Sequence, residues 1–598
     1  MPIIHVEPLG KTLTAERGAS LRDLLQGAGI LLDFPCGAKG TCRQCRLTID
    51  PPSASGTGTL AEAESAGGVR LACQTVIEGD CTVTIPEARM SGKVWKQGLR
   101  DSDIAMAIGG TLQRIEVPLA APSLDDQRSD WERLKAGLAS RGIGAATPDA
   151  PSLEQLSLLL RESGWTAEAL CEEKDFLWLG ARGGGHAHGF AVDLGTTTVD
   201  IALFDLETGR RLGRRAFLNG QIAFGADVIS RAQSFHSARE PVRKAALDTI
   251  DEGARSLLAE AGVKPELVVK TVVVGNPIML HILNGIDPWQ LTSVPYIPVA
   301  SCSLRSAPRE FGWTFQKSGC VEILPLISAY VGADTIGMIV ALDLEREAKS
   351  SLNIDIGTNG EMVLARQGKL LATSTAAGPA FEGAQISCGM RALDGAIVAV
   401  SIGGGGEISL QVVGDSQPRG ICGTGLISAI AALLDRGVID ETGRLLDPGE
   451  VADPGLAARV FPIGSELAFA LSEDRRVYIS QNDVRKLQLA KGAVRTGIDT
   501  LLDVTGMPRE GLDAVRLAGN FGAGLDARAA MRIGLIPPMD LAKVEVVGNA
   551  ALKGAILVLL SREQWRKSES AARNALFLEL GGKPEFQARF ADAMMFSW

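Results

Sequence analysis

Four cysteines near the start of the chain have a spacing that could hold a cluster of metal ions. Cys36, Cys42 and Cys45 follow the pattern Cys-x5-Cys-x2-Cys, and Cys73 lies further along the chain. Two iron ions bridged by sulfide need four thiolate ligands, which one loop and one distant residue can supply together. Two glycines between the first two cysteines would let the loop wrap closely, so that backbone N–H groups could face the sulfurs and tune the reduction potential.

The choice of metal and of the fourth ligand leaves alternatives open. Plant-type ferredoxins have Cys-x4-Cys-x2-Cys, so this spacing, one residue longer, matches the wider ferredoxin family. A structural zinc site is the other use of four cysteines, but zinc sites usually pair two short knuckles, and this chain has one. Cys81 competes with Cys73 as the fourth ligand, although the segment around Cys73 resembles the ferredoxin fourth-ligand strand. We predict a [2Fe–2S] cluster on Cys36, Cys42, Cys45 and Cys73.

A second kind of chemistry is indicated by a polar turn that occurs twice. Residues 193–198 (Asp-Leu-Gly-Thr-Thr-Thr) lie between two apolar stretches, and residues 355–360 (Asp-Ile-Gly-Thr-Asn-Gly) have the same layout. Glycine and threonine at the tip of a hairpin can present N–H groups and hydroxyls to phosphate oxygens, and an aspartate at the strand end can hold Mg²⁺. One such turn could simply reverse the chain, whereas two copies favour duplicated subdomains that face one nucleotide. The predicted phosphate-binding residues are Gly195, Thr196, Thr197, Thr198, Gly357, Thr358, Asn359 and Gly360, with Asp193 and Asp355 near Mg²⁺.

The two turns resemble the phosphate-1 and phosphate-2 motifs of the acetate kinase, sugar kinase, Hsp70 and actin superfamily. The resemblance implies that each hairpin opens a subdomain with a five-stranded sheet and that ATP lies between the subdomains. Residues 514–522 resemble the adenosine motif of the same superfamily, with Gly519, Asn520 and Gly522 under the nucleoside. The resemblance also makes Asp334 a candidate for positioning the attacking water; its alternative role is that of a helix N-cap.

Further segments resemble one family of this superfamily, the ATP-dependent reductive activators of corrinoid proteins. The segments that carry this resemblance, beside the cysteine box, are 274–281, 329–334, 377–384, 420–425 and 483–491. The family reduces an inactive Co(II) corrinoid protein to Co(I), the nucleophile of methyl transfer. Membership would imply a corrinoid protein as electron acceptor, an external low-potential electron donor, and a homodimer.

A cluster and an ATPase in one chain make physical sense if ATP drives an electron uphill. Plant-type clusters have potentials near about −400 mV, and the family role implies that cobalt is harder to reduce than that. Each 100 mV of deficit costs roughly 2.3 kcal/mol for one electron. Nucleotide binding can cover this cost only if the nucleotide states differ in how they bind the partner.

The surrounding elements predict a multidomain α/β protein. We expect a β-grasp ferredoxin-like domain over 1–87, a linker over 88–110, a small α/β middle domain over 111–185, and a large two-subdomain, actin-like ATPase domain over 186–598. Alternating apolar residues predict an N-terminal hairpin, and Ser20 is a plausible N-cap for the helix that follows it. Apolar spacing near 3.6 residues predicts two helices in the middle domain, where we find no catalytic motif. The expected strands are 3–6, 12–15, 47–49, 75–77, 82–85 and 112–117, and the expected helices are 21–26, 129–139 and 153–160.

Composition narrows the class of protein. The chain has 598 residues, 46% hydrophobic and 22% charged, with a formal net charge of −10, which is ordinary for a globular protein and unlike a basic nucleic-acid footprint. The N-terminus lacks a signal-peptide pattern and no apolar run reaches the roughly 20 residues of a membrane span. We therefore expect a cytoplasmic protein without nucleic-acid or membrane partners. Thiols stay reduced in that compartment, so Cys171, Cys302, Cys320 and Cys422 are predicted to be buried core residues.

Three other functions remain as alternatives. An activator of a radical dehydratase uses a similar ATPase fold, but it shares a cluster between subunits and lacks a ferredoxin box. A non-catalytic nucleotide sensor with a structural metal would have no redox-active cluster. A small-molecule kinase would transfer phosphate to a metabolite, and nothing in the sequence names one.

Overall fold

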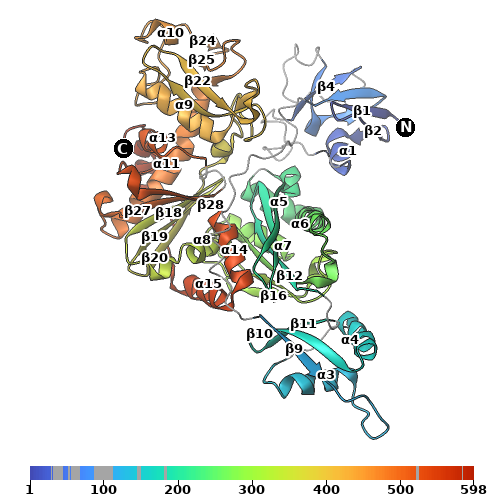
Figure 1. The fold of residues 1–598 in the computed structure, drawn as a ribbon. Helices are drawn as coiled ribbons and strands as arrows, with labels where there is room; N and C mark the ends of the chain where they lie inside the picture. The colour runs from blue at the N-terminus through green and yellow to red at the C-terminus, as the bar shows by residue number, and fades with distance from the viewer. Residues whose placement is uncertain are drawn as a thin grey trace.

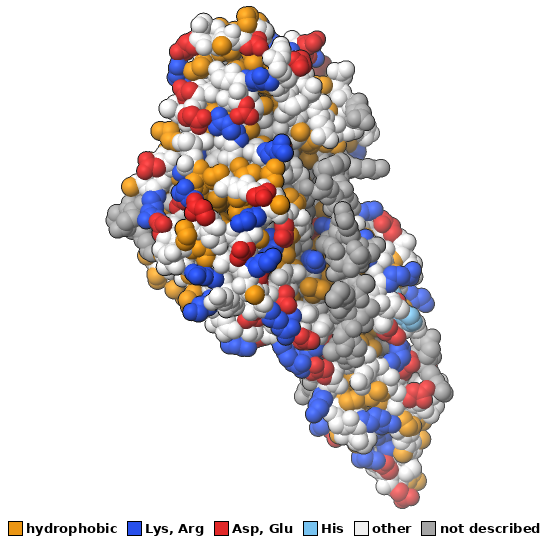
Figure 2. Space-filling model, turned by 60° about the vertical axis from the view of Figure 1, so that its left-hand side comes forward, with side chains coloured by type: hydrophobic (Ala, Val, Ile, Leu, Met, Phe, Trp, Pro, Cys, Tyr) orange, Lys and Arg blue, Asp and Glu red, His pale blue; other side chains and the backbone are white. Residues whose placement is uncertain are grey.

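The computed structural model describes residues 1–28, 30, 45–51, 54–55, 68–85, 112–144, 150–180, 185–225, 227–519, 524–581 and 584–598. In Figure 1 the N-terminal strands lie at the upper end, two large sheets with their helices form the middle, and a small three-stranded unit projects at the lower end. On the face drawn in Figure 2, acidic and basic side chains are intermixed. None of the helices in the described ranges combines the length and the apolar character that a membrane span requires.

The N-terminal unit, here called the cluster module (residues 1–85), contains a five-stranded sheet in the order β2-β1-β8-β4-β6. Residues of β1 alternate between solvent and core, so that Ile4 and Val6 are fully buried. Asp23 N–H donates to Ser20 Oγ at the start of α1, as the N-cap prediction required. The elements are β1 (Ile3–Glu7), β2 (Lys11–Thr14), α1 (Leu21–Gly27), β4 (Arg46–Asp50), β6 (Val69–Leu71), η1 (Ala72–Gln74), β7 (Val76–Ile77) and β8 (Cys81–Thr84).

The next unit, here called the middle module (residues 112–180), is a small antiparallel sheet with two helices. Its strand order is β11-β10-β9, and Leu134 and Leu138 of α3 pack on the sheet together with Val117 of β9. The elements are β9 (Leu112–Pro118), α3 (Asp130–Ala139), α4 (Ala150–Glu162), β10 (Thr166–Glu172) and β11 (Asp175–Gly180). The predicted strand and both predicted helices are confirmed.

The rest of the chain contains two six-stranded sheets of matching topology. The first has the order β14-β13-β12-β15-β17-β16, and the second reads β20-β19-β18-β27-β28 with β29 beside β20. In each sheet an antiparallel three-stranded meander is followed by two parallel strands. The two meanders begin with the strands that carry Asp193 and Asp355. The expected pair of five-stranded, actin-like subdomains is thus confirmed, and each sheet gains one edge strand.

The strands of the first sheet are β12 (His188–Leu194), β13 (Thr198–Asp205), β14 (Arg211–Leu218), β15 (Val268–Gly275), β16 (Leu304–Ser306) and β17 (Cys320–Ile323). Those of the second sheet are β18 (Ser351–Ile356), β19 (Gly360–Arg366), β20 (Lys369–Thr375), β27 (Ala514–Ala518), β28 (Val544–Gly548) and β29 (Leu576–Phe577).

Helices bury the faces of both sheets. Helices α8 (Ala333–Ala341) and α14 (Ala550–Leu560) pack on each other, and α14 also covers β12 and β15, while α6 (Arg239–Ala261) covers β13 and β14. Helix α11 (Gln481–Val504) covers β19 and β20. The chain between β20 and α11 forms an insertion of two three-stranded sheets, which Figure 1 shows at the upper left. Its elements are β21 (Ala396–Ile402), β22 (Ile408–Val412), β23 (Gly420–Ile421), α9 (Gly423–Asp435), α10 (Pro454–Ala457), β24 (Val460–Ile463), β25 (Glu466–Ala470) and β26 (Tyr478–Ser480).

Candidate functional site

The two predicted phosphate turns line one cleft between the two sheets. The first turn joins β12 to β13, with Asp193 opposite Asp200 in the register, and the second joins β18 to β19. The predicted residues that line the cleft are Asp193, Gly195, Thr196, Thr197, Thr198, Asp334, Asp355, Gly357, Thr358, Asn359 and Gly519. Gly360 does not line the cleft. A side chain there would approach Val494 and Thr375 to 3.0 and 3.2 Å, so Gly360 permits close packing of β19 against α11.

Backbone geometry fixes the shape of the first turn. Gly195 N–H donates to Thr198 O at 3.0 Å, and a Cβ at Gly195 would lie 2.6 Å from that oxygen. Two asparagines hold the turn from outside: Asn219 Nδ2 donates to Gly195 O at 2.8 Å, and Asn276 Nδ2 donates to Thr196 Oγ1 at 3.2 Å. The threonine hydroxyls are therefore presented on a rigid turn.

Four carboxylates gather around the two turns: Glu361 is buried, and Asp193, Asp334 and Asp355 are half-buried. Burial raises the pKa of Asp193, Asp334, Asp355 and Glu361, and repulsion from neighbouring carboxylates adds to the rise at Asp193, Asp355 and Glu361. The pKa reaches about 6 for Asp334 and about 7 for Asp355. Such mutual repulsion disfavours ionisation of all four groups unless a cation joins them.

The donor set fits a magnesium ion that is bound together with a nucleotide. Within the described ranges no three acidic, His or Cys side chains converge as a ready ligand set. Mg²⁺ usually takes one or two carboxylates and fills the remaining positions with phosphate oxygens and water. Asp193 and Asp355, one from each sheet, would be the protein's contribution.

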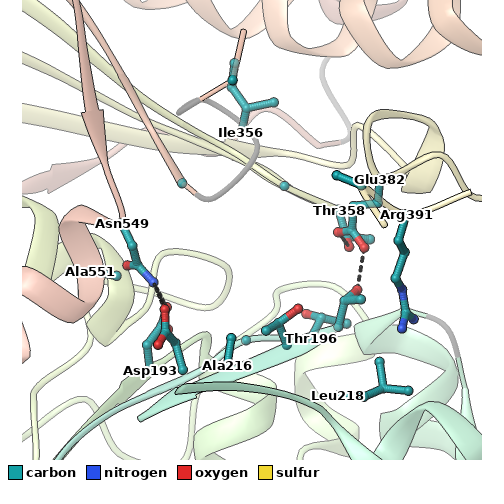
Figure 3. A pocket seen from close by; sticks show the side chains of 18 of the residues that line it. Asp193, Thr196, Ala216, Leu218, Ile356, Thr358, Glu382, Arg391, Asn549 and Ala551 are labelled. Carbon is teal, nitrogen blue, oxygen red and sulfur yellow. Dashed lines mark hydrogen bonds between the residues drawn. The ribbon is translucent and has the colours of Figure 1, made fainter. Parts of the chain in front are cut away.

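A side chain from the far end of the chain reaches Asp193. Asn549 is the N-cap of α14, accepts from Leu552 N–H at 2.8 Å, and donates its own amide hydrogen to Asp193 Oδ2 at 2.8 Å (Figure 3). This hydrogen bond opposes the rise in the pKa of Asp193. Asn549 was not predicted as a site residue, although an asparagine before an apolar helical run is a recognisable N-cap signal.

Asp334 lies near the start of α8 but does not cap it. Gly332 is the N-cap, and the Asp334 carboxylate accepts from the backbone N–H of Thr335 at 2.7 Å. The alternative N-cap role is therefore wrong, because the helix begins two residues earlier than that role requires. The carboxylate lines the cleft with the two phosphate turns.

The predicted nucleoside-binding turn is described in part. Gly519 follows β27 with φ +86°, a conformation that favours glycine, and a Cβ there would lie 2.4 Å from Asp355 Oδ1. Asn520 and Gly522 lie outside the described residues. Gly519 thus lets the chain pass directly beside the phosphate-2 turn.

The cluster loop is also described in part. Cys45 and Cys73 bring their sulfur atoms to 3.3 Å from each other, one at the start of β4 and the other in η1. Cys36 and Cys42 lie outside the described residues. Cys81 lies in β8, is 4% exposed, and has a thiol pKa that burial raises, which is typical of a structural cysteine. The geometry favours Cys73 over Cys81 as the fourth ligand.

The other cysteines agree with prediction in three of four cases. Cys171, Cys320 and Cys422 are buried, as expected, whereas Cys302 is exposed. The prediction for Cys302 is wrong, because this residue lies in the exposed segment just before the short edge strand β16.

Family models match consecutive parts of the chain. Residues 4–78 match a 2Fe-2S iron-sulfur cluster binding domain, and residues 101–180 match the linker region of the protein called RACo. Residues 188–347 match the RACo middle region, and residues 349–598 match the C-terminal domain of RACo, described as its ASKHA domain.

Individual relatives cover most of the chain. A corrinoid activation enzyme of Eubacterium limosum, RamQ, is 28% identical over 607 aligned residues, which cover 98% of each protein. A protein of Methanosarcina barkeri named [Co(II) methylated amine-specific corrinoid protein] reductase is 28% identical over 63% of this chain and 71% of its own.

A solved structure, titled reductive activator for corrinoid, iron-sulfur protein, is 32% identical with a TM-score of 0.72, over 100% of this chain and 98% of that one. Agreement in both fold and sequence along the whole length confirms the resemblance that the cysteine box and the paired phosphate turns first indicated. The chain belongs to the family of ATP-dependent reductive activators of corrinoid proteins.

Proposed function

We propose that this protein uses Mg-ATP to drive the one-electron reduction of a Co(II) corrinoid protein to Co(I), and so reactivates a corrinoid-dependent methyltransferase. The observation that carries the proposal is the combination in one chain of a cluster module, with Cys45 and Cys73 at 3.3 Å, and a cleft between duplicated phosphate turns. Bound to this module, a [2Fe–2S] cluster would supply one electron at low potential.

Different residues of the cleft would bind the phosphates, the Mg²⁺ ion and the attacking water. The turns around Thr197 and Thr358 would donate to phosphate oxygens, and Asp193 and Asp355 would hold Mg²⁺ from opposite sides. Asp334 would orient the attacking water, because its carboxylate lines the same cleft. Asn549 keeps the Asp193 carboxylate in place.

The proposed function also requires an electron donor and a reducing compartment. The cluster would be reduced by a separate low-potential electron donor, and its cysteines must stay reduced, as in the cytoplasm. The family resemblance supports a homodimer.

The test is anaerobic absorbance spectroscopy of the pre-reduced protein mixed with a Co(II) corrinoid protein, with and without Mg-ATP. The expected result is Co(I) only in the presence of Mg-ATP. A cluster that is redox-active but never yields Co(I), with several corrinoid proteins tried, would contradict the proposed acceptor.

Two variants separate the two halves of the machinery. Cys45→Ala should abolish Co(I) formation and leave Mg-ATP binding intact, while Asp193→Ala should abolish ATP-dependent turnover and leave the cluster spectrum intact. Co(I) formation by the first variant, or wild-type turnover by the second, would contradict the corresponding assignment.

A further inference from the structure

The carboxylate of Glu382 joins the two phosphate turns. Thr197 of the first turn donates its hydroxyl hydrogen to Glu382 Oε2, and Thr358 of the second turn donates to Glu382 Oε1. Figure 3 shows the carboxylate of Glu382 beside Thr358, above the first turn and inside the cleft. Glu382 itself belongs to a third segment, η9 (Pro379–Glu382), which follows the second meander.

This arrangement and a bound triphosphate exclude each other. A threonine hydroxyl has one hydrogen to donate, so Thr197 and Thr358 cannot donate to Glu382 and to a phosphate oxygen at once. The negative charge of the carboxylate would also repel the phosphates at short range. A nucleotide that uses both turns must therefore displace Glu382.

A buried positive charge interacts electrostatically with Glu382. Arg231 of α5 (Val228–Ser237) is fully buried, and its Nε donates to Gly225 O at 2.8 Å. Its Nη2 has no hydrogen-bond partner among the described residues. Burial lowers the pKa of Arg231 to about 9, and the charge of Glu382 opposes this fall, so the two groups lie near each other. A carboxylate released from the threonines can remain close to a cation.

The segment after Glu382 is a closed loop, here called the relay loop (residues 383–389). Its two stems touch: a Cβ at Gly389 would lie 2.0 Å from Gly383 O, and a Cβ at Gly383 would lie 2.5 Å from Met390 O. Because the stems leave no room for a side chain between them, Glu382 is joined directly to a tightly closed loop.

The far end of the relay loop contacts the start of α11 and strand β26. Ser387 N–H donates to the buried Asp483 Oδ1 at 2.9 Å, and Lys486 donates to Gln385 O. Tyr478 N–H donates to Cys388 Sγ at 3.5 Å. The relay loop is thus held by residues of the insertion and of α11, on the side away from the phosphates.

One residue of this contact region, Tyr478, interacts electrostatically with the cluster module. The pKa of Tyr478 is raised by burial first and then by Cys388 and Asp483, and the positive charge of Arg46 partly offsets the rise, so Arg46 lies near Tyr478. Arg46 directly follows Cys45 in the chain.

We propose that Glu382 relays nucleotide binding to the relay loop: the phosphates of a nucleoside triphosphate take over the hydroxyls of Thr197 and Thr358, and the released Glu382 moves the relay loop against the start of α11 and strand β26. The inference rests on the proposed use of Mg-ATP. Only an interaction that differs between the nucleotide-free and the nucleotide-bound state can shift the position of the relay loop. The hydrogen bonds of Glu382 to Thr197 and Thr358 would differ between these two states.

The test uses the full-length protein with its cluster and the probe Mg-AMP-PNP, with no corrinoid protein present. Glu382→Ala should bind the nucleotide about tenfold more tightly, because two hydrogen bonds to a charged group no longer compete. In the wild type, nucleotide should raise hydrogen–deuterium exchange of residues 383–389, measured by mass spectrometry. In Glu382→Ala the exchange should already be high and should no longer respond to nucleotide.

Two further variants keep the result interpretable. Asp248→Ala removes an exposed carboxylate of α6 that pairs with Lys244 outside the cleft and should leave both affinity and exchange unchanged, which separates the relay from a general loss of negative charge. Glu382→Gln retains the shape of the side chain and should tighten binding by a smaller factor, even if the alanine variant folds poorly.

Unchanged or weaker nucleotide binding by both Glu382 variants would overturn the relay. Hydrogen–deuterium exchange of residues 383–389 that does not change when the wild type binds nucleotide would also overturn it. A wild type that binds Mg-AMP-PNP and moves the loop, but never yields Co(I) with ATP, would contradict the proposed function and leave the relay standing.

Discussion

At the scale of single residues, the cleft is governed by the cost of burying carboxylates together. Asp193, Asp334, Asp355 and Glu361 come from three different stretches of chain, and burial raises the pKa of each. A divalent cation bound with the nucleotide would stabilise their ionised forms. Binding of Mg-ATP should therefore release protons near neutral pH.

Asp355 should make stability depend on pH. Its pKa is raised from 3.8 to about 7 in the folded protein, so the folded state binds this proton more tightly than the unfolded chain does. The stability that it contributes is complete below pH about 4 and is lost as pH rises through about 7. In the absence of Mg²⁺, the melting temperature of the wild type should therefore fall as the pH rises from about 4 to about 7. The melting temperature of Asp355→Asn should fall less steeply over the same range.

The matched control is Asp248→Asn, since Asp248 is half exposed and paired with Lys244 on the surface of α6. This variant should follow the wild-type pH profile in differential scanning calorimetry. Parallel profiles for the wild type and Asp355→Asn would show that the Asp355 carboxyl is not perturbed.

At the scale of elements, the site depends on where helices begin. Asn276 caps α7 (Pro277–Leu283) and holds Thr196, while Asn549 caps α14 and holds Asp193. Each asparagine uses its oxygen for the helix and its amide hydrogens for the site. A helix end is well suited to this double role because its first N–H groups need an acceptor in any case.

Loss of the second cap should affect both stability and turnover. Asn549→Ala should cost about 1 kcal/mol of unfolding free energy, the usual value of an N-cap. It should also raise the pKa of Asp193 further, because the hydrogen bond that opposes the rise is gone. ATP-dependent turnover should therefore fall, and the rising limb of its pH–rate profile should shift to higher pH. Urea unfolding measures the loss of stability, and the pH–rate profile measures the change in turnover.

Ser129→Ala gives the comparison, because Ser129 caps α3 in the middle module and accepts from Glu132 N–H at 3.2 Å. It should lose similar stability and keep the wild-type pH–rate profile. An unshifted profile for Asn549→Ala would leave Asn549 a helix cap and nothing more.

At the scale of the whole molecule, the middle module is fastened to the first sheet by buried charges. Lys270 of β15 is fully buried, donates to Glu172 of β10 at 2.8 Å, and lies 3.2 Å from Glu322 of β17. Burial alone would lower the pKa of Lys270, but the two glutamates outweigh it and raise the pKa. Arg562 adds a second cation to Glu322 at 3.1 Å. The middle module should therefore move with the first sheet as one body.

Removal of the central cation should loosen this junction. Lys270→Met leaves two buried carboxylates with too little positive charge, which typically costs about 3–5 kcal/mol. The expected result is a lower melting temperature and faster proteolysis between the middle module and β12. Lys244→Met, which breaks an exposed pair on α6, should change stability by less than about 1 kcal/mol; an equal effect of the two substitutions would contradict the fastening role of Lys270.

The parts of the fold whose signals are local could be predicted from the sequence. The N-terminal hairpin, the cap at Ser20, the helices of the middle module and both strand–turn–strand motifs are recognisable because their periodicity and turn residues lie within a few positions of one another. The duplication of the Asp-x-Gly turn likewise predicted the paired sheets. The exact ends of the domains stay predictions.

Which distant residues meet depends on how the two sheets and their helices pack. The pairing of Asn549 with Asp193, the repulsion between Glu361 and Asp334, the closeness of Lys270 to Glu172, and the bridge of Glu382 between Thr197 and Thr358 join positions far apart in the chain. A single glutamate has no local pattern that sets it apart from a surface residue. The role of Glu382 arises because the packing of the two sheets brings the hydroxyls of Thr197 and Thr358 within hydrogen-bonding distance of one carboxylate. Spacing along the chain does not reveal this arrangement.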